Sequence, residues 1–409
     1  MRRTELALAA APLTFLRAHA DDPTALLDIR PGPAPKILVW DHETLTELFR
    51  QDPQLRHPGS RSLSPLLGRD SVLWADGERH TAYRRAFGAP LRERRLAGYR
   101  DLIAAAANSA IDALPSGAVF GLAGWTRSLA LTIVARIVLG DGPGADPALL
   151  HEVTAWFDRA LGSRRRMLAH RFLRGGLPRS GPDLDARLVA AARAGRGGLV
   201  SPQAGGAHPL PDGELRDQIV SLLFAGHETT ASATAWTLYW LTRRADLHDA
   251  VLSEVDAGAD GTDPDRSPVL QAVIAEALRL CPPVEVAGNR ALTRPAELLG
   301  RKLPAGTVVT PGIHLSHHRA EYFPDPHTFD PHRFLGRRGT PDGYLPFGGG
   351  SRYCLGSRLG LLEIRMVTAA LLRRRVLRCV NPRAGVLRMR GHAMAPSDRL
   401  RLEVVSCRD

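Results

Sequence analysis

Cys354 is the residue of this sequence best placed to do chemistry, because it lies in a glycine-rich stretch, FGGGSRYCLG, at 347–356. The apolar run that follows predicts a buried helix. The cysteine would then stand at a helix entry, where the helix dipole favours the thiolate that binds metals. The glycines supply backbone freedom and N–H groups that can point at sulfur. Arg352 can donate a charge-assisted hydrogen bond to a ligand carboxylate. A lone cysteine is usually a small buried side chain, so the interpretation depends on the whole loop.

A second candidate site lies inside a long apolar helix expected over 212–242, which contains the segment AGHETT at 225–230. An acid followed by threonines is costly in the middle of a helix. Glu228 and Thr229 can relay protons from solvent, while the small Ala225 and Gly226 leave space beside the helix. We expect His227 on the helix surface or behind the site, and not as a metal ligand. The alternative is a kinked core helix whose threonines bond their own carbonyls.

Two further patterns place charged residues on shared helix faces. His80 and Arg84 are four apart and together offer cations to an anion. Glu276 and Arg279 are three apart in an apolar helix expected over 269–280, so their charges are expected to be buried and paired. Arg333 is available as a third member.

Together these motifs resemble those of the cytochrome P450 family, the haem–thiolate monooxygenases, in the soluble bacterial form. The chain matches F-x-x-G-x-R-x-C-x-G, A-G-x-[ED]-T-T, D-G-x-x-H-x-x-x-R at 76–84, and E-x-x-R with a later arginine, in the family's order from about residue 37 onward. The resemblance implies one domain over 1–409, mainly α with a smaller β-rich part (α+β). Its triangular helical body would surround a buried haem, with β-rich subregions near 30–60 and 284–315.

The resemblance also assigns roles to residues. Cys354 becomes the axial ligand of haem iron, Glu228 and Thr229 manage protons, and Glu276, Arg279 and Arg333 form a structural triad behind the haem loop. The residues expected to contact the cofactor are Cys354, His80, Arg84, Arg290, Arg352, Phe347, Gly348, Gly356, Ala225 and Gly226. Those expected to line the substrate pocket are Leu222, Ala225, Val284, Glu285, Val286 and Met394. The region 150–211 would be the lid over the substrate. Glu285 departs from the usual apolar residue, and would bind a polar part of the substrate or point to solvent.

The implied activity is O2- and electron-dependent hydroxylation or epoxidation of a small organic substrate, with secondary-metabolite tailoring suggested by family analogy. The cofactor would be haem b. Electrons would come from NAD(P)H through an external ferredoxin reductase and ferredoxin, since no glycine-rich phosphate loop follows a strand. One alternative is a haem-binding sensor or carrier, which has no need of the acid–threonine pair. Another is a peroxide-using or substrate-rearranging relative, many of which lack that pair.

Composition sets the remaining expectations. Lys and Arg number 54 against 42 Asp and Glu, a net charge of +12 that suits an acidic partner or reflects coding bias. Arg85, Arg92, Arg94 and Arg95 would be a solvated face or part of a docking surface. The four cysteines show no paired spacing, which fits a reducing cytoplasm. The N-terminus resembles a signal peptide, but Glu5, Pro12 and Arg17 interrupt its apolar run, which favours an amphipathic helix. We expect a monomer with no membrane span and no nucleic-acid partner.

Overall fold

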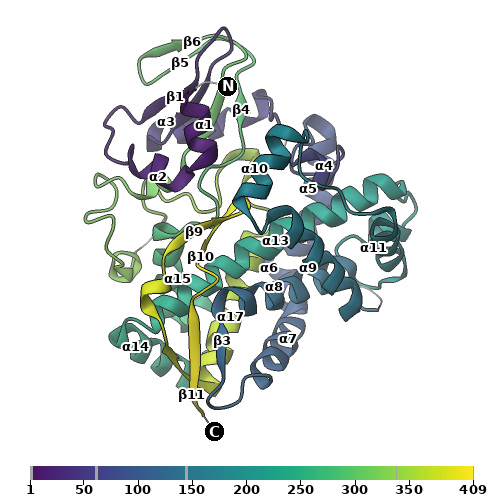
Figure 1. Cartoon of the computed structure of the whole chain (residues 1–409), viewed down its shortest axis with the longest axis vertical. Coiled ribbons are helices and arrows are strands. Elements are labelled where there is room, and N and C mark those ends of the chain that lie inside the picture. The colour runs from purple at the N-terminus through teal and green to yellow at the C-terminus, as the bar shows by residue number, and fades with distance from the viewer. Residues whose placement is uncertain (1–2, 60–62, 143–145, 338, 409) are drawn as a thin grey trace.

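A helix of 30 residues, α13 (Asp212–Leu241), runs through the middle of the helical body (Figure 1). The computed structural model describes residues 3–59, 63–142, 146–337 and 339–408. Acidic Asp212 and Glu214 lie in the first turn of α13, where they complement the helix dipole. Buried residues occur on nearly every face of its second half, as expected for a core helix.

The other helices pack around α13 or cap the ends of the molecule (Figure 1). They are α1 (Arg3–Ala10), α2 (Pro12–Arg17), α3 (His42–Arg50), α4 (Ser64–Leu67), α5 (Gly77–Gly88), α6 (Glu93–Leu96), α7 (Arg100–Asp112), α8 (Leu122–Leu139), α9 (Pro147–Leu161), α10 (Arg164–Leu173), α11 (Pro182–Ala194), α12 (Ser201–Gly205), α14 (Ala245–Asp256), α15 (Pro268–Leu280), α16 (Ile313–His317) and α17 (Ser357–Arg374).

The strands form small sheets. The largest has the order β1-β2-β7-β4, made by β1 (Leu26–Arg30), β2 (Lys36–Val39), β7 (Val308–Pro311) and β4 (Arg290–Ala291). In it β2 and β7 run parallel, with Lys36 opposite Val308, so the two β-rich regions expected from the sequence share one sheet. The remaining strands are β5 (Ala296–Leu298) with β6 (Arg301–Leu303), β9 (Leu387–Arg390) with β10 (Ala393–Pro396), and β3 (Val119–Gly121) with β11 (Arg401–Cys407) and β8 (Arg375–Cys379).

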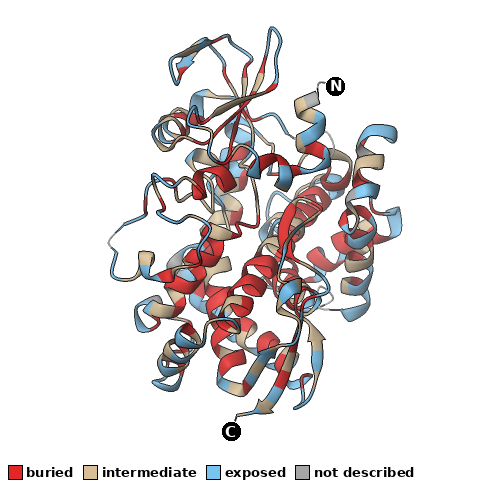
Figure 2. Cartoon of the chain, turned by 60° about the vertical axis from the view of Figure 1, so that its left-hand side comes forward, coloured by how far each residue is buried: buried red, intermediate tan, exposed pale blue. Residues whose placement is uncertain are grey.

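The predicted class, mainly α with a smaller β-rich part, is confirmed. Buried residues concentrate in the helical body (Figure 2). One apolar cluster joins α5, α7, α8, α9 and α11 to the first half of α13, and a second joins its other half to α14, α15 and α17. Burial of this apolar surface is the main favourable contribution to folding. Helix α8 is long and apolar enough to cross a membrane, but 67% of it is buried inside the structure, which is typical of a core helix.

The apolar period of the sequence predicts a helix over 147–161, and α9 has these bounds. Asp41 caps α3, because its carboxylate accepts from the Thr44 N–H at 2.9 Å. The expected single N-terminal helix is two short ones, α1 and α2, the second beginning at Pro12. The Gly- and Pro-rich stretches 56–71 and 195–213 predict loops, but they contain the short helices α4 and α12.

Candidate active site

The Cys354 loop contains three consecutive glycines, Gly348–Gly350, at positions that disfavour a side chain. Gly348 and Gly350 have φ of +66° and +68°, in the left-handed region. Between them, a Cβ on Gly349 would lie 2.2 Å from the Phe49 ring. The loop closes where the Cys354 N–H donates to the Phe347 carbonyl at 3.0 Å. Helix α17 then begins three residues after the cysteine.

The environment of Cys354 corrects the expectation that a helix entry alone favours the thiolate. The side chain is exposed, yet the surrounding protein atoms desolvate its sulfur. This desolvation raises the pKa of the Cys354 thiol, and the Gly356 N–H and Arg84 only partly oppose it. The thiolate therefore needs a further positive group, such as a metal ion, to be the stable form.

Helix α5 brings His80 and Arg84 to this loop, since a Cβ on Gly88 would lie 2.9 Å from the Leu355 side chain. Arg84 is half-buried and interacts electrostatically with Cys354. Burial lowers the pKa of His80 to about 4, and Arg352 and Arg84 contribute. Burial and the neighbouring arginines therefore disfavour the cation at His80 in the protein alone, and the expected contact with an anion stays a prediction.

Arg352 presents an unfilled set of hydrogen-bond donors. Its Nη2 donates to the Ala75 carbonyl at 2.6 Å and to Asp76 Oδ1 at 2.5 Å. Its Nε and Nη1 are buried and have no hydrogen-bond partner among the described residues. An anionic acceptor would satisfy these two buried donor nitrogens of the guanidinium.

Arg290 is fully buried and already engaged. It donates to Asp52 Oδ1 at 2.9 Å and to the carbonyls of Gly349 and Gly288 at 2.9 and 2.6 Å. Ser351 also donates to Asp52, at 2.9 Å. The structure thus places Arg290 as a clamp on the cysteine loop, whereas the sequence led us to expect an arginine directed at a ligand.

Asp52 and His57, which the sequence analysis did not single out, link these groups together with Asp76. His57 lies 2.7 Å from Asp76 through Nδ1 and 3.3 Å from Asp52 through Nε2. The result is a chain of polar contacts that runs Arg290–Asp52–His57–Asp76–Arg352. No local pattern could reveal it, since Asp52 and Arg290 are 238 positions apart.

The acid–threonine segment of α13 presents Ala225 as an exposed residue in a mostly buried helix. Thr229 Oγ1 donates to the Ala225 carbonyl at 2.6 Å, which is the self-bonding that the sequence left open as an alternative. The same hydroxyl oxygen can still accept a hydrogen bond. Gly226 faces α8, where a Cβ would lie 2.6 Å from Val134. Its missing side chain therefore serves helix packing, and not the open space we expected.

Glu228 is paired, although the sequence suggested a carboxylate reaching toward solvent. Its Oε1 lies 3.0 Å from Arg390 Nε, and Arg390 also ion-pairs with Asp158 of α9 and Asp398. Burial raises the pKa of Glu228, and the charge of Arg390 opposes that rise. The balance suits a group that exchanges protons.

His227 is buried, so of its two expected positions the helix surface is wrong and the place behind the site stays a prediction. Its ring stacks on Phe157 of α9, with centroids 5.8 Å apart. Burial lowers the pKa of His227 to about 3, and burial also lowers that of His318 to about 4.

Because the pKa values of His227 and His318 are lowered in the folded protein, we expect the free energy of unfolding to fall in acid. Both pKa values lie below the unfolded value near 6.5, so the unfolded chain binds more protons as the pH falls from 6.5 toward 4. Each histidine should remove about 1.4 kcal/mol of unfolding free energy per pH unit in that window. Denaturant titrations at several pH values give the unfolding free energy as a function of pH. Its slope should be shallower for His227→Leu than for the unmodified protein, by the equivalent of about one proton. Exposed His208→Gln is the control and should keep the original slope; equal slopes for all three proteins would contradict the account.

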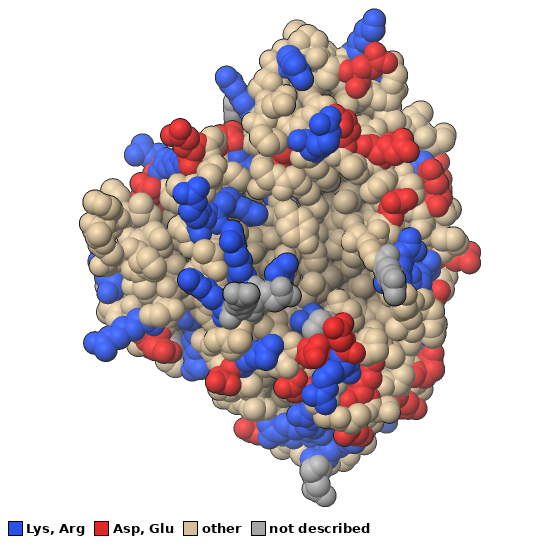
Figure 3. All heavy atoms as spheres, turned by 180° about the vertical axis from the view of Figure 1, so that it is seen from behind, with Lys and Arg blue, Asp and Glu red and all other residues tan. Residues whose placement is uncertain are grey.

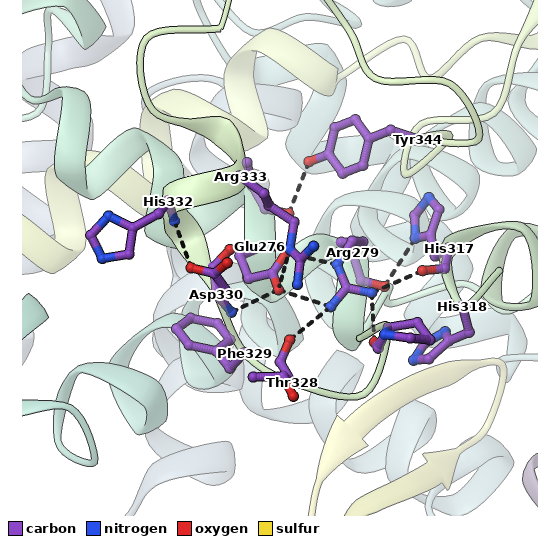
Figure 4. Close-up of polar contacts among 12 residues, drawn as sticks. Glu276, Arg279, His317, His318, Thr328, Phe329, Asp330, His332, Arg333 and Tyr344 are labelled. Carbon is purple, nitrogen blue, oxygen red and sulfur yellow. Dashed lines mark hydrogen bonds and ion pairs between the residues drawn. The ribbon is translucent and has the colours of Figure 1, made fainter. Parts of the chain in front are cut away.

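Glu276, Arg279 and Arg333 meet behind the loop (Figure 4). Glu276 and Arg279 are both fully buried and joined by two hydrogen bonds of 2.7 and 2.8 Å. The other Arg279 donors reach the carbonyls of His317, Pro326 and Thr328. Arg333 Nε lies 3.2 Å from Glu276. Through His317 Nε2, which accepts from the Leu345 N–H at 2.8 Å, the cluster supports the chain that leads into the cysteine loop.

The residues expected in the substrate pocket occupy different environments. Leu222, Val284 and Glu285 are half-buried. Val286 is also half-buried, but it packs against the N-terminal apolar cluster. Met394 is fully buried, and its N–H donates to the Pro283 carbonyl at 2.7 Å. The two alternatives for Glu285 stay predictions.

Comparison with known proteins identifies the family. The family model "Cytochrome P450" matches residues 199–391. The protein named cytochrome P450 135B1 of Mycobacterium tuberculosis (strain ATCC 25618 / H37Rv) is 33% identical over 397 residues, covering 91% of this chain and 83% of the relative. The chain belongs to the cytochrome P450 family. Cyclooctat-9-en-7-ol 5-monooxygenase of Streptomyces melanosporofaciens is also similar, at 31% identity over 92% of this chain and 87% of the relative.

Solved P450 structures share the fold. Retinoic acid-bound cyanobacterial CYP120A1 superimposes with a TM-score of 0.83 at 22% identity, covering 98% of this chain and 95% of that one. CYP175A1 from Thermus thermophilus gives a TM-score of 0.75 at 27% identity, covering 98% of this chain and 96% of that one. This P450 is a monooxygenase, and the family uses haem, O2 and electrons from redox partners.

The residues of this P450 fit a haem. Cys354 would offer sulfur to the haem iron, and the open Nε and Nη1 of Arg352 would suit a propionate carboxylate. Arg84 has no carboxylate partner among the described residues and adds a second cation nearby. The positive charge of the iron would favour the Cys354 thiolate that the protein alone does not.

Proposed function

We propose that this P450 hydroxylates or epoxidises a small organic substrate, using haem b and electrons delivered from NAD(P)H by a ferredoxin reductase and a ferredoxin. The observation that carries the proposal is an exposed Cys354 two residues after Arg352, whose buried Nε and Nη1 have no hydrogen-bond partner among the described residues. A haem held by thiolate activates O2 for transfer of one oxygen atom to a C–H or C=C bond. A place in secondary metabolism is supported by the name of the Streptomyces relative.

The chain's own residues would handle the protons. Thr229 Oγ1, held by the Ala225 carbonyl, keeps its acceptor side available beside the exposed Ala225. Glu228 holds or releases a proton at Oε1 according to its contact with Arg390. Asp158 and Asp398 are 53% and 58% exposed, so Arg390 connects the relay to solvent. We propose a cytoplasmic monomer with this arrangement.

A ligand screen followed by turnover tests this function. Purified haem-loaded protein should show spin-state shifts with a subset of small apolar compounds, since these displace water beside the iron. With NAD(P)H, a ferredoxin reductase and a surrogate ferredoxin, the same compounds should gain one oxygen atom, as measured by mass spectrometry. Binding of O2 or carbon monoxide without any product from the compounds that shift the spectrum would favour a sensor or carrier.

Replacing Thr229 with alanine should separate electron use from product formation. Loss of the hydroxyl removes one member of the proton relay, so product per NAD(P)H consumed should fall about tenfold, with a matching rise in released peroxide. The matched control is Thr237→Ala, since Thr237 makes the same bond to Ala233 at 2.9 Å farther along α13. Unchanged coupling in Thr229→Ala would remove Thr229 from the mechanism.

We further propose that an acidic ferredoxin docks on the basic face beside the cysteine loop. Arg85, Arg92 and Arg95 are exposed near the end of α5 that contacts Leu355, while the side chain of Arg94 lies outside the described residues. Figure 3 shows Lys and Arg side chains gathered on part of one face of the molecule. Charge complementarity of this kind raises association rates at low salt.

Charge reversal at Arg92 tests the docking face. Arg92→Glu should slow ferredoxin-dependent reduction about tenfold at low ionic strength, with the difference shrinking as salt is added. Exposed Arg383, in the turn Pro382–Ala384, gives the control Arg383→Glu. Equal slowing by both variants would mean that net charge matters and that this face does not.

A further inference from the structure

A cavity of about 590 Å³ lies between α9, α10 and the start of α11, outside the Cys354 site. This volume falls in the range of small-molecule sites, roughly 300–1,000 Å³. Its floor is apolar, with Trp156 and Leu184 only 2% and 8% exposed and with Ala155 and Pro178 beside them. The Trp156 indole N–H donates to the Pro178 carbonyl at 3.1 Å, which fixes one wall.

The charged side chains of the cavity are mostly basic. Three arginines lie on its lining, Arg159, Arg166 and Arg179, together with two histidines, His151 and His170. The three arginines are exposed and have no carboxylate partner among the described residues. Two carboxylates also line the cavity, Glu152 and Asp183. Glu152 is already ion-paired with Arg187, so basic groups outnumber the free acid at the opening.

We propose that this cavity binds a small organic anion, namely a carboxylate or phosphate group joined to an apolar body. Guanidinium groups recognise both oxyanions through paired N–H donors. The apolar body would lie on Trp156 and Leu184, where it loses contact with water. The same chemistry arises in a free acid or in a phosphate ester, and the probes below distinguish the two.

The cavity adjoins the helix contact that supports the proton relay. Trp156 and Arg159 of α9 line it, while the intervening residues Phe157 and Asp158 contact His227 and Arg390. Within the described part of the chain, no residue of α13 or of the cysteine loop lines the cavity. The site is therefore separate from the haem site and shares only helix α9 with its surroundings.

Titration calorimetry on the haem-loaded protein tests the proposal, with octanoate, octyl phosphate, inorganic phosphate and octanol as probes. Octanoate, octyl phosphate or both should bind saturably and more tightly than octanol, and the tighter of the two identifies the preferred oxyanion. The double variant Arg159→Gln/Arg166→Gln should weaken that binding at least about tenfold, because it removes two charge-assisted donors. Arg383 does not line the cavity, so Arg383→Gln is the control and should bind as the unmodified protein does.

Haem absorbance recorded in the same titration reports any binding beside the iron separately. The proposal is overturned if neither anion binds, if octanol binds as tightly, or if the double variant binds octanoate and octyl phosphate unchanged. Ala155→Phe supplies a second variant, because a larger side chain on the cavity wall should also weaken anion binding without removing a charge. Circular dichroism verifies that each variant is folded.

Discussion

Glu276→Ala is expected to yield almost no folded, haem-loaded protein. Arg279 is fully buried and directs two of its five N–H donors at Glu276, so the substitution leaves a buried guanidinium without its counter-charge. Breaking a buried pair in this way costs about 3–5 kcal/mol. That is a large share of a total stability of roughly 5–15 kcal/mol. The measurements are soluble yield, haem content per protein and the midpoint of thermal unfolding.

A matched surface pair controls for loss of a glutamate. Glu321 is 61% exposed and pairs with Arg319, so Glu321→Ala should cost about 1 kcal/mol or less. Glu276→Gln should lie between the two, since the amide keeps one acceptor for Arg279 but no charge. Normal haem content and an unchanged unfolding midpoint for Glu276→Ala would show that the cluster does not support the loop.

Cys354→His is expected to abolish oxygen transfer while the protein stays folded. Imidazole can ligate haem iron, but it lacks the electron donation by which thiolate promotes cleavage of the O–O bond. Product formation should fall to the background of the reductase and ferredoxin alone, as measured by mass spectrometry of the product. Exposed Cys407 on β11 gives the control, and Cys407→Ser should keep full activity. Product formation by Cys354→His at the original rate would remove the thiolate from the reaction.

Local patterns in the sequence were sufficient for the helices and for groups close together along the chain. The apolar period gave α9 and α13, and spacings of three and four placed Glu276 with Arg279 and His80 with Arg84. The order of the motifs indicated the family. Each of these signals depends on helix geometry or on a short loop, which a sequence displays directly.

What depended on tertiary packing could not be predicted. The role of Gly226 is decided by Val134 of another helix, and the lowered pKa of His80 comes from its burial beside two arginines. The network through His57 joins two carboxylates from separate segments. In the region 150–211, α10 was missed because its arginine-rich stretch carries little periodic signal. Helix α11 was missed as well, although five of its apolar residues are buried.

The most direct test of sulfur ligation is the absorption spectrum of the reduced carbon monoxide complex of the unmodified, haem-loaded protein. With Cys354 as the axial ligand, the main band should lie far to the red of that of an imidazole-ligated haem, because thiolate donates more electron density to the iron. A band at the position typical of histidine ligation, with Cys354 intact, would contradict the central claim.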